Sequence, residues 1–165
     1  MSNIPSLDLN DFLSNDKKRK DDFVKSIGKA YQEIGFLSLK NHFLSKDNVE
    51  NLYNQIKYFF DMSSEVKSKY EFDGFKGQRG YTSFGKEHAK GKKEGDLKEF
   101  WHFGQYLEDG DKSKFNYPDN PYVDEVPEFN TAGETTYKAL EKTGVYVLRA
   151  IALFLELEEN HFDKY

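Results

Sequence analysis

The residues best suited to recognising a small molecule are gathered between Tyr58 and Gly104. Polar and aromatic residues alternate there, first in the run Gln78–Ser83 and again after Gly95. Three glycines divide the first part of this stretch: Gly74, Gly77 and Gly80. They do not make a phosphate-binding loop, because no Gly-Lys-Ser/Thr follows them. Glycines in such a setting mark tight turns or a close approach to the backbone, so we expect a small-molecule binding surface here.

A second pattern that could do chemistry lies at the C-terminal end. His161-Phe162-Asp163 spells His-x-Asp, a spacing that suits two iron ligands on one strand. Only Lys164 and Tyr165 follow, so no third histidine comes after the pair. We therefore interpret this segment as an ordinary surface segment and predict no metal ligands in the chain.

Composition limits the classes of function that fit the chain. The 165 residues carry a net charge of −5, which argues against binding to nucleic acid or to an anionic membrane. There is no cysteine, no signal peptide, and no apolar run near the ~20 residues that a membrane span needs. The 15 Phe, 11 Tyr and 1 Trp can build a core despite the low hydrophobic content of 37%. These features indicate a soluble, cytoplasmic protein, and the length indicates one domain or a large piece of one.

The elements that must position these residues follow from periodicity and capping signals. The acidic pair Asp21 and Asp22 is expected to start a helix that Gly35 ends. Ser45 and Ser63 or Ser64 are expected to cap two further helices, and the capping box of Thr131 and Glu134 to open a long one. In order, we predict an extended segment at 4–9, a helix at 21–34, a strand at 36–39, helices at 46–60 and 64–70, a strand at 97–103 and a helix at 131–157.

The predicted strand at 97–103 carries one unusual residue. Alternation places Leu97, Trp101 and Phe103 on one face together with the charged Glu99, and His102 on the opposite face. A carboxylate on an apolar face is more often paired than catalytic. Lys98 cannot be the partner, because neighbours on a strand point to opposite faces.

Five stretches of the sequence resemble, in the correct order, motifs of the isopenicillin-N-synthase-like Fe(II)/2-oxoglutarate-dependent oxygenases. The opening Ile4-Pro5-Ser6-Leu7-Asp8-Leu9 is similar to "IPxIDL", and residues 35–42 resemble "GFFxVxNH", with Phe43 where the family has glycine. Residues 59–67 resemble the "FFxLPxEEK" helix end, Gly80-Tyr81 the "GY" motif, and Asp96-Leu97-Lys98-Glu99 the "DxKE" motif. The motifs span nearly the whole chain.

This resemblance implies an α+β fold class: the helix-rich N-terminal half of a double-stranded β-helix (jelly-roll) oxygenase. Residues 1–165 would form one N-terminal region, and the jelly roll with its His-x-Asp…His triad and Arg-x-Ser motif would lie downstream. Fe(II) and 2-oxoglutarate are then expected cofactors of a full-length member, whereas this chain alone is expected to bind neither. The resemblance also places His161 at the end of the long helix, in agreement with the interpretation above.

The resemblance also suggests residues that contact substrate. Relatives use a polar or basic residue just before Gly-Tyr, and an aromatic residue near it, to hold a substrate carboxylate. Here these positions correspond to Arg79, Tyr81 and Thr82, although Arg79 lies one position nearer the glycine than in the pattern it resembles. An arginine fork suits bidentate contact with a carboxylate. His102 lies on the strand that borders the active-site mouth in the family, so we add it to the predicted substrate-binding residues.

Two functions remain open at this level. The chain is either the N-terminal portion of an oxygenase, supplying scaffold and part of the substrate mouth, or a non-catalytic fragment that acts as a binding or oligomerising module. In the second case the chain would fold on itself or with a partner through apolar residues on more than one face of the helix at 131–157. The isolated chain is then expected either to self-associate through this helix or to be only loosely folded. A small-molecule substrate is the expected partner in the first case.

Overall fold

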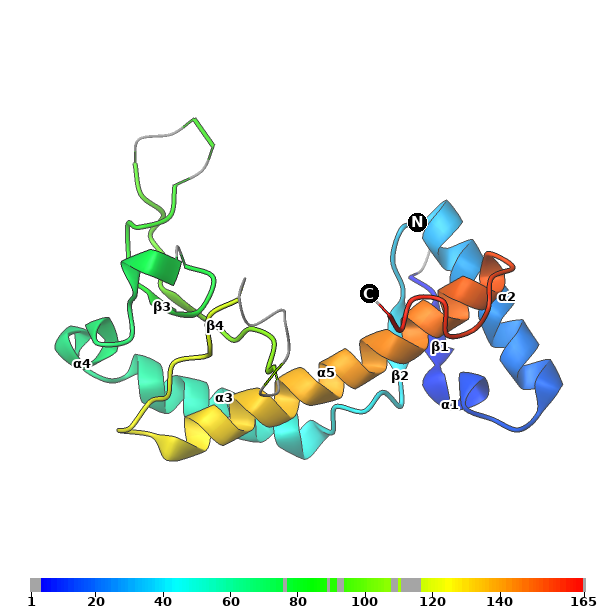
Figure 1. Ribbon diagram of the computed structural model, residues 1–165, viewed down its shortest axis with the longest axis horizontal. Helices are drawn as coiled ribbons and strands as arrows, with labels where there is room; N and C mark the ends of the chain where they lie inside the picture. Colours follow the sequence, from blue (N-terminus) through cyan, green and yellow to red (C-terminus); the bar gives the residue numbers. More distant parts are fainter. Residues whose placement is uncertain are drawn as a thin grey trace. The chain divides into compact units, whose positions relative to one another are not determined.

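The computed structural model in Figure 1 describes residues 4–75, 77–88, 90–91, 94–107, 110 and 117–164. The chain divides into two compact units, one made of Met1–Ser45 with Ala139–Tyr165 and the other of Lys46–Lys138. The longest helix, α5 (Pro127–Phe154), contributes residues to both. Within the described residues, no helix combines the length and the apolar character needed to cross a membrane.

The unit that contains both termini has a small parallel sheet. Strands β1 (Ser6–Asp8) and β2 (Ser38–Lys40) pair with Leu7 opposite Leu39. The extended segment predicted at 4–9 is confirmed as far as Asp8, where a one-turn helix, α1 (Leu9–Phe12), begins instead. The strand predicted at 36–39 is present but begins two residues later.

Helix α2 (Lys17–Glu33) begins earlier than predicted. Asp16 caps it, accepting a hydrogen bond from the backbone N–H of Lys18 at 2.8 Å. The acidic pair at 21 and 22 therefore does not start the helix, and forms ion pairs with lysines four residues earlier. The end is as predicted, because Gly35 has a φ of +90°, the left-handed conformation that a glycine after a helix adopts.

The core of this unit joins the first elements to the C-terminal part of α5. The buried members are Leu9, Phe12, Phe23, Ile27 and Ala150. At Gly28 the helix α2 is closely approached by the ring of Phe154, since a Cβ built on the glycine would lie 2.1 Å from the ring. Glycine is required there for space.

The second unit holds the remaining elements. They are α3 (Lys46–Phe60), α4 (Ser64–Ser68), a 3₁₀ turn η1 (Asp73–Phe75), and the strands β3 (Gly80–Thr82) and β4 (Phe100–His102). Ser63 caps α4 as predicted, through a hydrogen bond from the backbone N–H of Val66. The strand predicted at 97–103 is shorter than expected: Leu97 is 93% exposed and lies outside β4.

An aromatic cluster forms the core of the second unit. Phe59, at the end of α3, is fully buried. Its ring centroid lies 4.9 Å from that of Trp101 and 5.0 Å from that of Phe129 in α5, with Tyr70 and Tyr81 at 6.2 and 6.0 Å. The abundant aromatic residues thus build a core despite the low hydrophobic content of the chain.

Helix α5 begins at Pro127, and the start predicted at Thr131 is wrong. Proline is well suited to the first turn of a helix, where its missing N–H is not needed. Glu134 therefore pairs with Lys138 at 2.5 Å, one turn further along, and does not take part in a capping box.

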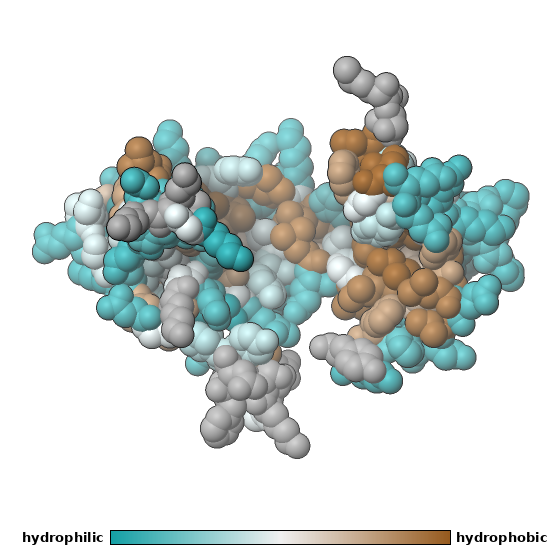
Figure 2. All heavy atoms as spheres, turned by 90° about the horizontal axis from the view of Figure 1, so that it is seen from above, coloured by the Kyte–Doolittle hydropathy of each residue, from teal (hydrophilic) through white to brown (hydrophobic). Residues whose placement is uncertain are grey.

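Apolar side chains remain exposed along the C-terminal part of the chain. Leu140 is 52% exposed and Leu148 is 44% exposed on α5, and Leu155, immediately after it, is 54% exposed. These positions are about two helical turns apart, so they share one side of the helix. Figure 2 shows hydrophobic surface gathered on the unit that contains both termini. The combination of helices with two small separate sheets agrees with the predicted α+β class.

Candidate functional site

The antiparallel pair β3–β4 forms a ribbon with two chemically different faces. Its register places Gly80 opposite His102, Tyr81 opposite Trp101, and Thr82 opposite Phe100. Because successive residues of a strand point to opposite faces, Thr82, Phe100 and His102 share one face, and Tyr81 and Trp101 share the other. We call these the cavity face and the core face. The predicted orientation of His102, opposite to Trp101, is confirmed.

The core face covers a buried ion pair. Lys67 of α4 is 6% exposed, and its Nζ donates to both carboxylate oxygens of Glu99 at 3.0 and 2.9 Å. The same nitrogen donates to the carbonyl oxygen of Phe60 at 3.1 Å. The hydroxyl of Tyr81 donates to Glu99 Oε2 at 2.5 Å. Glu99 is thus paired, and with a residue other than Lys98, as predicted.

The network shifts the pKa values of Glu99 and Tyr81. Burial by itself raises the pKa of Glu99, but the hydrogen bonds from Lys67 and Tyr81 outweigh it, so the pKa lies below the ordinary value. Burial, followed by the hydrogen bond to Glu99, raises the pKa of the Tyr81 hydroxyl. The arrangement holds a carboxylate ionised and a phenol neutral beneath the ribbon.

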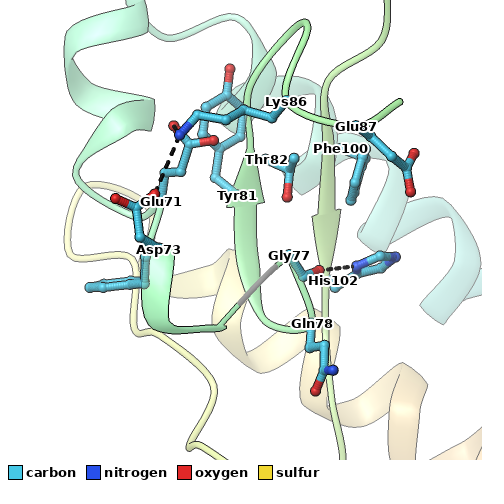
Figure 3. A pocket seen from close by; sticks show the side chains of 11 residues that line it. Glu71, Asp73, Gly77, Gln78, Tyr81, Thr82, Lys86, Glu87, Phe100 and His102 are labelled. Carbon is cyan, nitrogen blue, oxygen red and sulfur yellow. Dashed lines mark hydrogen bonds and ion pairs between the residues drawn. The ribbon is translucent and has the colours of Figure 1, made fainter. Parts of the chain in front are cut away.

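The cavity face lines a cavity of about 390 Å³. Figure 3 shows Thr82, Phe100 and His102 lining it together with residues of the 71–78 segment and with Lys86 and Glu87. A cavity of this size falls within the range of small-molecule sites.

Hydrogen bonds fix the walls of this cavity. Glu71 accepts from the backbone N–H of Ser83 at 2.8 Å and from its hydroxyl at 2.9 Å. Lys86 pairs with Asp73 at 3.3 Å. His102 Nδ1 lies 2.5 Å from the carbonyl oxygen of Gly77, so Nδ1 carries the proton and Nε2 is left as an acceptor in the neutral ring.

Arg79 is buried elsewhere, next to Gly104. The residue is 8% exposed, and its Nη1 donates to the carbonyl oxygen of Gln78 at 2.8 Å. The guanidinium lies 5.9 Å from the ring centroid of Tyr117. In the part of the chain that the structure describes, its Nε has no hydrogen-bond partner and the guanidinium forms no ion pair, unlike those of Arg19 and Arg149.

The four residues predicted to bind substrate are therefore divided. Tyr81, Thr82 and His102 all border the cavity, although the hydroxyl of Tyr81 is committed to Glu99. Arg79 is not among the residues that line it. Sequence reasoning missed Phe100, which lines the cavity beside His102.

Sequence reasoning also missed Lys67, the partner of Glu99. The carboxylate of Glu99 on an apolar face indicated a cationic partner. No local signal singles out Lys67, which is 32 residues away, from the other lysines.

The His161-x-Asp163 segment does not present a metal site. It follows α5 as a series of turns, and the carboxylate of Asp163 is held by Arg149, with Nη2 2.6 Å from Oδ2. Among the described residues, no three His, Cys, Asp or Glu side chains are placed to hold a metal ion together. The residues that the structure describes therefore do not fit an iron centre.

Comparison with known proteins gives consistent matches. The family described as "non-haem dioxygenase in morphine synthesis N-terminal" matches residues 4–125. The chain is 29% identical over 168 residues to a 1-aminocyclopropane-1-carboxylate oxidase of Dictyostelium mucoroides, covering 98% of this chain and 45% of that protein.

Two solved structures are similar over nearly the whole chain. A 2OG-Fe(II) oxygenase family protein from Caulobacter crescentus has a TM-score of 0.83 and 32% identity, covering 99% of this chain and 52% of the other. A full-length Neurospora crassa protein in complex with alpha-KG has a TM-score of 0.77 and 26% identity, covering 98% and 46%. The chain therefore spans about half the length of the proteins it matches.

Proposed function

The chain belongs to the non-haem dioxygenase N-terminal family, and we propose that it is the N-terminal portion of an Fe(II)/2-oxoglutarate-dependent oxygenase that oxidises a small organic molecule. The resemblance inferred from the five sequence motifs is thereby confirmed at the level of the family. The proposed role of this portion is to supply scaffold and part of the substrate mouth. Fe(II) and 2-oxoglutarate would be held by residues outside these 165, on the jelly roll expected downstream.

The observations that carry this proposal are the match to an N-terminal family model and the match of nearly the entire chain to about half of a 2OG-Fe(II) oxygenase family protein. A relative crystallised with alpha-KG supports the choice of cosubstrate. The absence of cysteine is compatible with a cytoplasmic location, which we propose as well.

Arg79, Tyr81, Thr82 and His102 are the proposed substrate-contacting residues. Arg79 is a buried guanidinium whose Nε has no hydrogen-bond partner in the described part of the chain. Burying a cation is costly unless an anion or hydrogen bonds compensate it. This favours the inference that Arg79 donates hydrogen bonds to the carboxylate of a bound molecule, for which its planar fork is suited.

The coding sequence that follows residue 165 provides the most direct test. We expect an open reading frame that contains His-x-Asp, a distal histidine and Arg-x-Ser, and we expect the longer protein to consume oxygen with 2-oxoglutarate and Fe(II). A frame without these residues would contradict the proposal, as would a longer protein that carries them but fails to convert 2-oxoglutarate.

A variant pair tests the role of Arg79 in the longer protein. Arg79→Lys keeps the charge and loses the fork, so the KM for a carboxylate-bearing substrate should rise. The matched control is Arg19→Lys, because Arg19 pairs with Asp11 on the surface with 52% of its side chain exposed. Equal kinetics for the two variants would remove Arg79 from the proposed contacts.

A further inference from the structure

The hydroxyl of Thr82 is buried beside an open cavity without a partner. Thr82 is 7% exposed, and its Oγ1 makes no hydrogen bond within the described part of the chain. Gly77 lies across from it, and a Cβ built on that glycine would approach Oγ1 to 3.3 Å. Buried hydroxyls are almost always hydrogen-bonded. This one therefore indicates a bound molecule that supplies the missing hydrogen-bond partner.

The wall next to this hydroxyl is aromatic. The rings of Phe100 and His102 lie with centroids 4.8 Å apart at 56°, side by side on the cavity face. Phe72 also lines the cavity. Aromatic side chains in the lining suit a flat ring, through offset or edge-to-face contact.

The charges around the cavity are unequal. Of the described lining residues, three are carboxylates, Glu71, Asp73 and Glu87, whereas Lys86 is the cation. Lys86 leans towards this group, at 3.3 Å from Asp73 and 4.0 Å from Glu71. Glu87 is paired with Lys98, so these three carboxylates face two lysines, and the negative charge in excess favours an ammonium over a carboxylate.

We propose that this cavity binds a small aromatic molecule that carries a protonated amine. The ring packs on Phe100 and His102, and the ammonium donates to Thr82 Oγ1 on the carboxylate-rich side. The identification of this molecule as a substrate rests on the proposed function. The binding does not, because the cavity is formed by these 165 residues alone. The cavity face then favours a positively charged group and Arg79 a negatively charged one, so the two bind different chemical groups.

Binding to the 165-residue chain is measured by calorimetry with two probes of matched shape and opposite charge, 2-phenylethylamine and 3-phenylpropionate. We expect the ammonium to bind at least about tenfold more tightly than the carboxylate at neutral pH. Thr82→Val, which removes the hydroxyl at nearly constant volume, should weaken the binding of 2-phenylethylamine by about tenfold or more, whereas Thr82→Ser should retain it.

Thr136→Val is the matched control. Thr136 is also buried, at 8% exposure, and its Oγ1 also lacks a partner within the described part of the chain, but it does not line the cavity. The Thr136→Val protein should bind 2-phenylethylamine as tightly as the unchanged protein does. Trp101 fluorescence establishes that each variant is folded.

Three results would overturn the inference: no binding of the amine, equal or tighter binding of the carboxylate, or equal loss in the Thr82→Val and Thr136→Val proteins. None of them bears on oxygen consumption by the longer protein. The proposed function could therefore stand while this inference fails, and the reverse also holds.

Discussion

Replacing Lys67 with methionine should destabilise the unit formed by Lys46–Lys138 by about 3–5 kcal/mol, the usual cost of removing one partner of a buried ion pair. Methionine keeps the length and the apolar stem of the side chain. It removes the two hydrogen bonds to Glu99 and the one to the carbonyl of Phe60. Glu99 would then keep the Tyr81 hydroxyl as its remaining partner in this network.

The size of this effect follows from burial. The side chain of Lys67 is 8% exposed and that of Glu99 is 17% exposed, so water cannot readily replace the lost partner. A surface pair such as Lys17 with Asp21, at 86% and 49% exposure, should cost at most about 1 kcal/mol when broken. Lys17→Met is therefore the control for the loss of a lysine as such.

Urea denaturation followed through the single tryptophan provides the assay, because Trp101 lies in the aromatic core of the same unit. The double variant Lys67→Met with Glu99→Leu should be more stable than the sum of the single effects predicts, by about 2 kcal/mol or more, since no charge is left buried. A loss below about 1 kcal/mol for Lys67→Met, or strict additivity in the double variant, would refute the reasoning.

The same pair predicts a dependence on pH. The pKa of Glu99 is lower in the folded chain than its ordinary value of 4.5. Its stabilising contribution is therefore fully present above pH 4.5 and is lost as the pH falls through the folded pKa. The stability difference between the unchanged protein and Glu99→Gln should shrink below pH 4.5, and a difference that persists to low pH would contradict this.

Three further outcomes can be measured directly. Gly28→Ala should destabilise the protein by about 1–3 kcal/mol in thermal unfolding, because the alanine Cβ would meet the ring of Phe154. This cost should exceed the gain from the better helix propensity of alanine. Unchanged stability would count against the close approach. We propose that the 165-residue chain self-associates through the exposed leucines of residues 131–157, so sedimentation should detect dimers that Leu148→Glu disperses, and a monomer at all concentrations would exclude this. Anaerobic calorimetry should detect Fe(II) binding to the chain no stronger than at a generic surface site, and a tight one-to-one complex abolished by His161→Ala would reverse that expectation.

Local signals in the sequence predicted the ends of helices well where a single residue determines where the helix begins or stops. Gly35 adopts the left-handed conformation that ends a helix, and Ser63 caps the next short helix as its side chain allows. The start of α5 was missed because Pro127 and Thr131 are both acceptable start signals, and the packing of Phe129 in the aromatic cluster favours the earlier one. The strand around Trp101 was predicted too long because alternation continues beyond the residues that find a partner strand.

The candidate site was predicted in part, for a similar reason. Alternation along one strand was enough to place His102 opposite Trp101. The cavity itself depends on the register between two strands, which sets Thr82 beside Phe100, and on a segment that turns back to bring Gly77 to His102. These are non-local relations, and a single sequence carries no direct record of them.

The contact between Arg79 and Gly104 sets how a change at position 104 would be felt. A Cβ at position 104 would lie 1.6 Å from the guanidinium carbon of Arg79, and Gly104 is not among the residues with positive φ, so glycine is present for space. The atoms that a Cβ would meet are the far end of a flexible side chain and not backbone. A larger residue at 104 would therefore displace the guanidinium from its place beside Tyr117 and leave the backbone where it is. Position 104 thus acts on this protein through the side chain of Arg79.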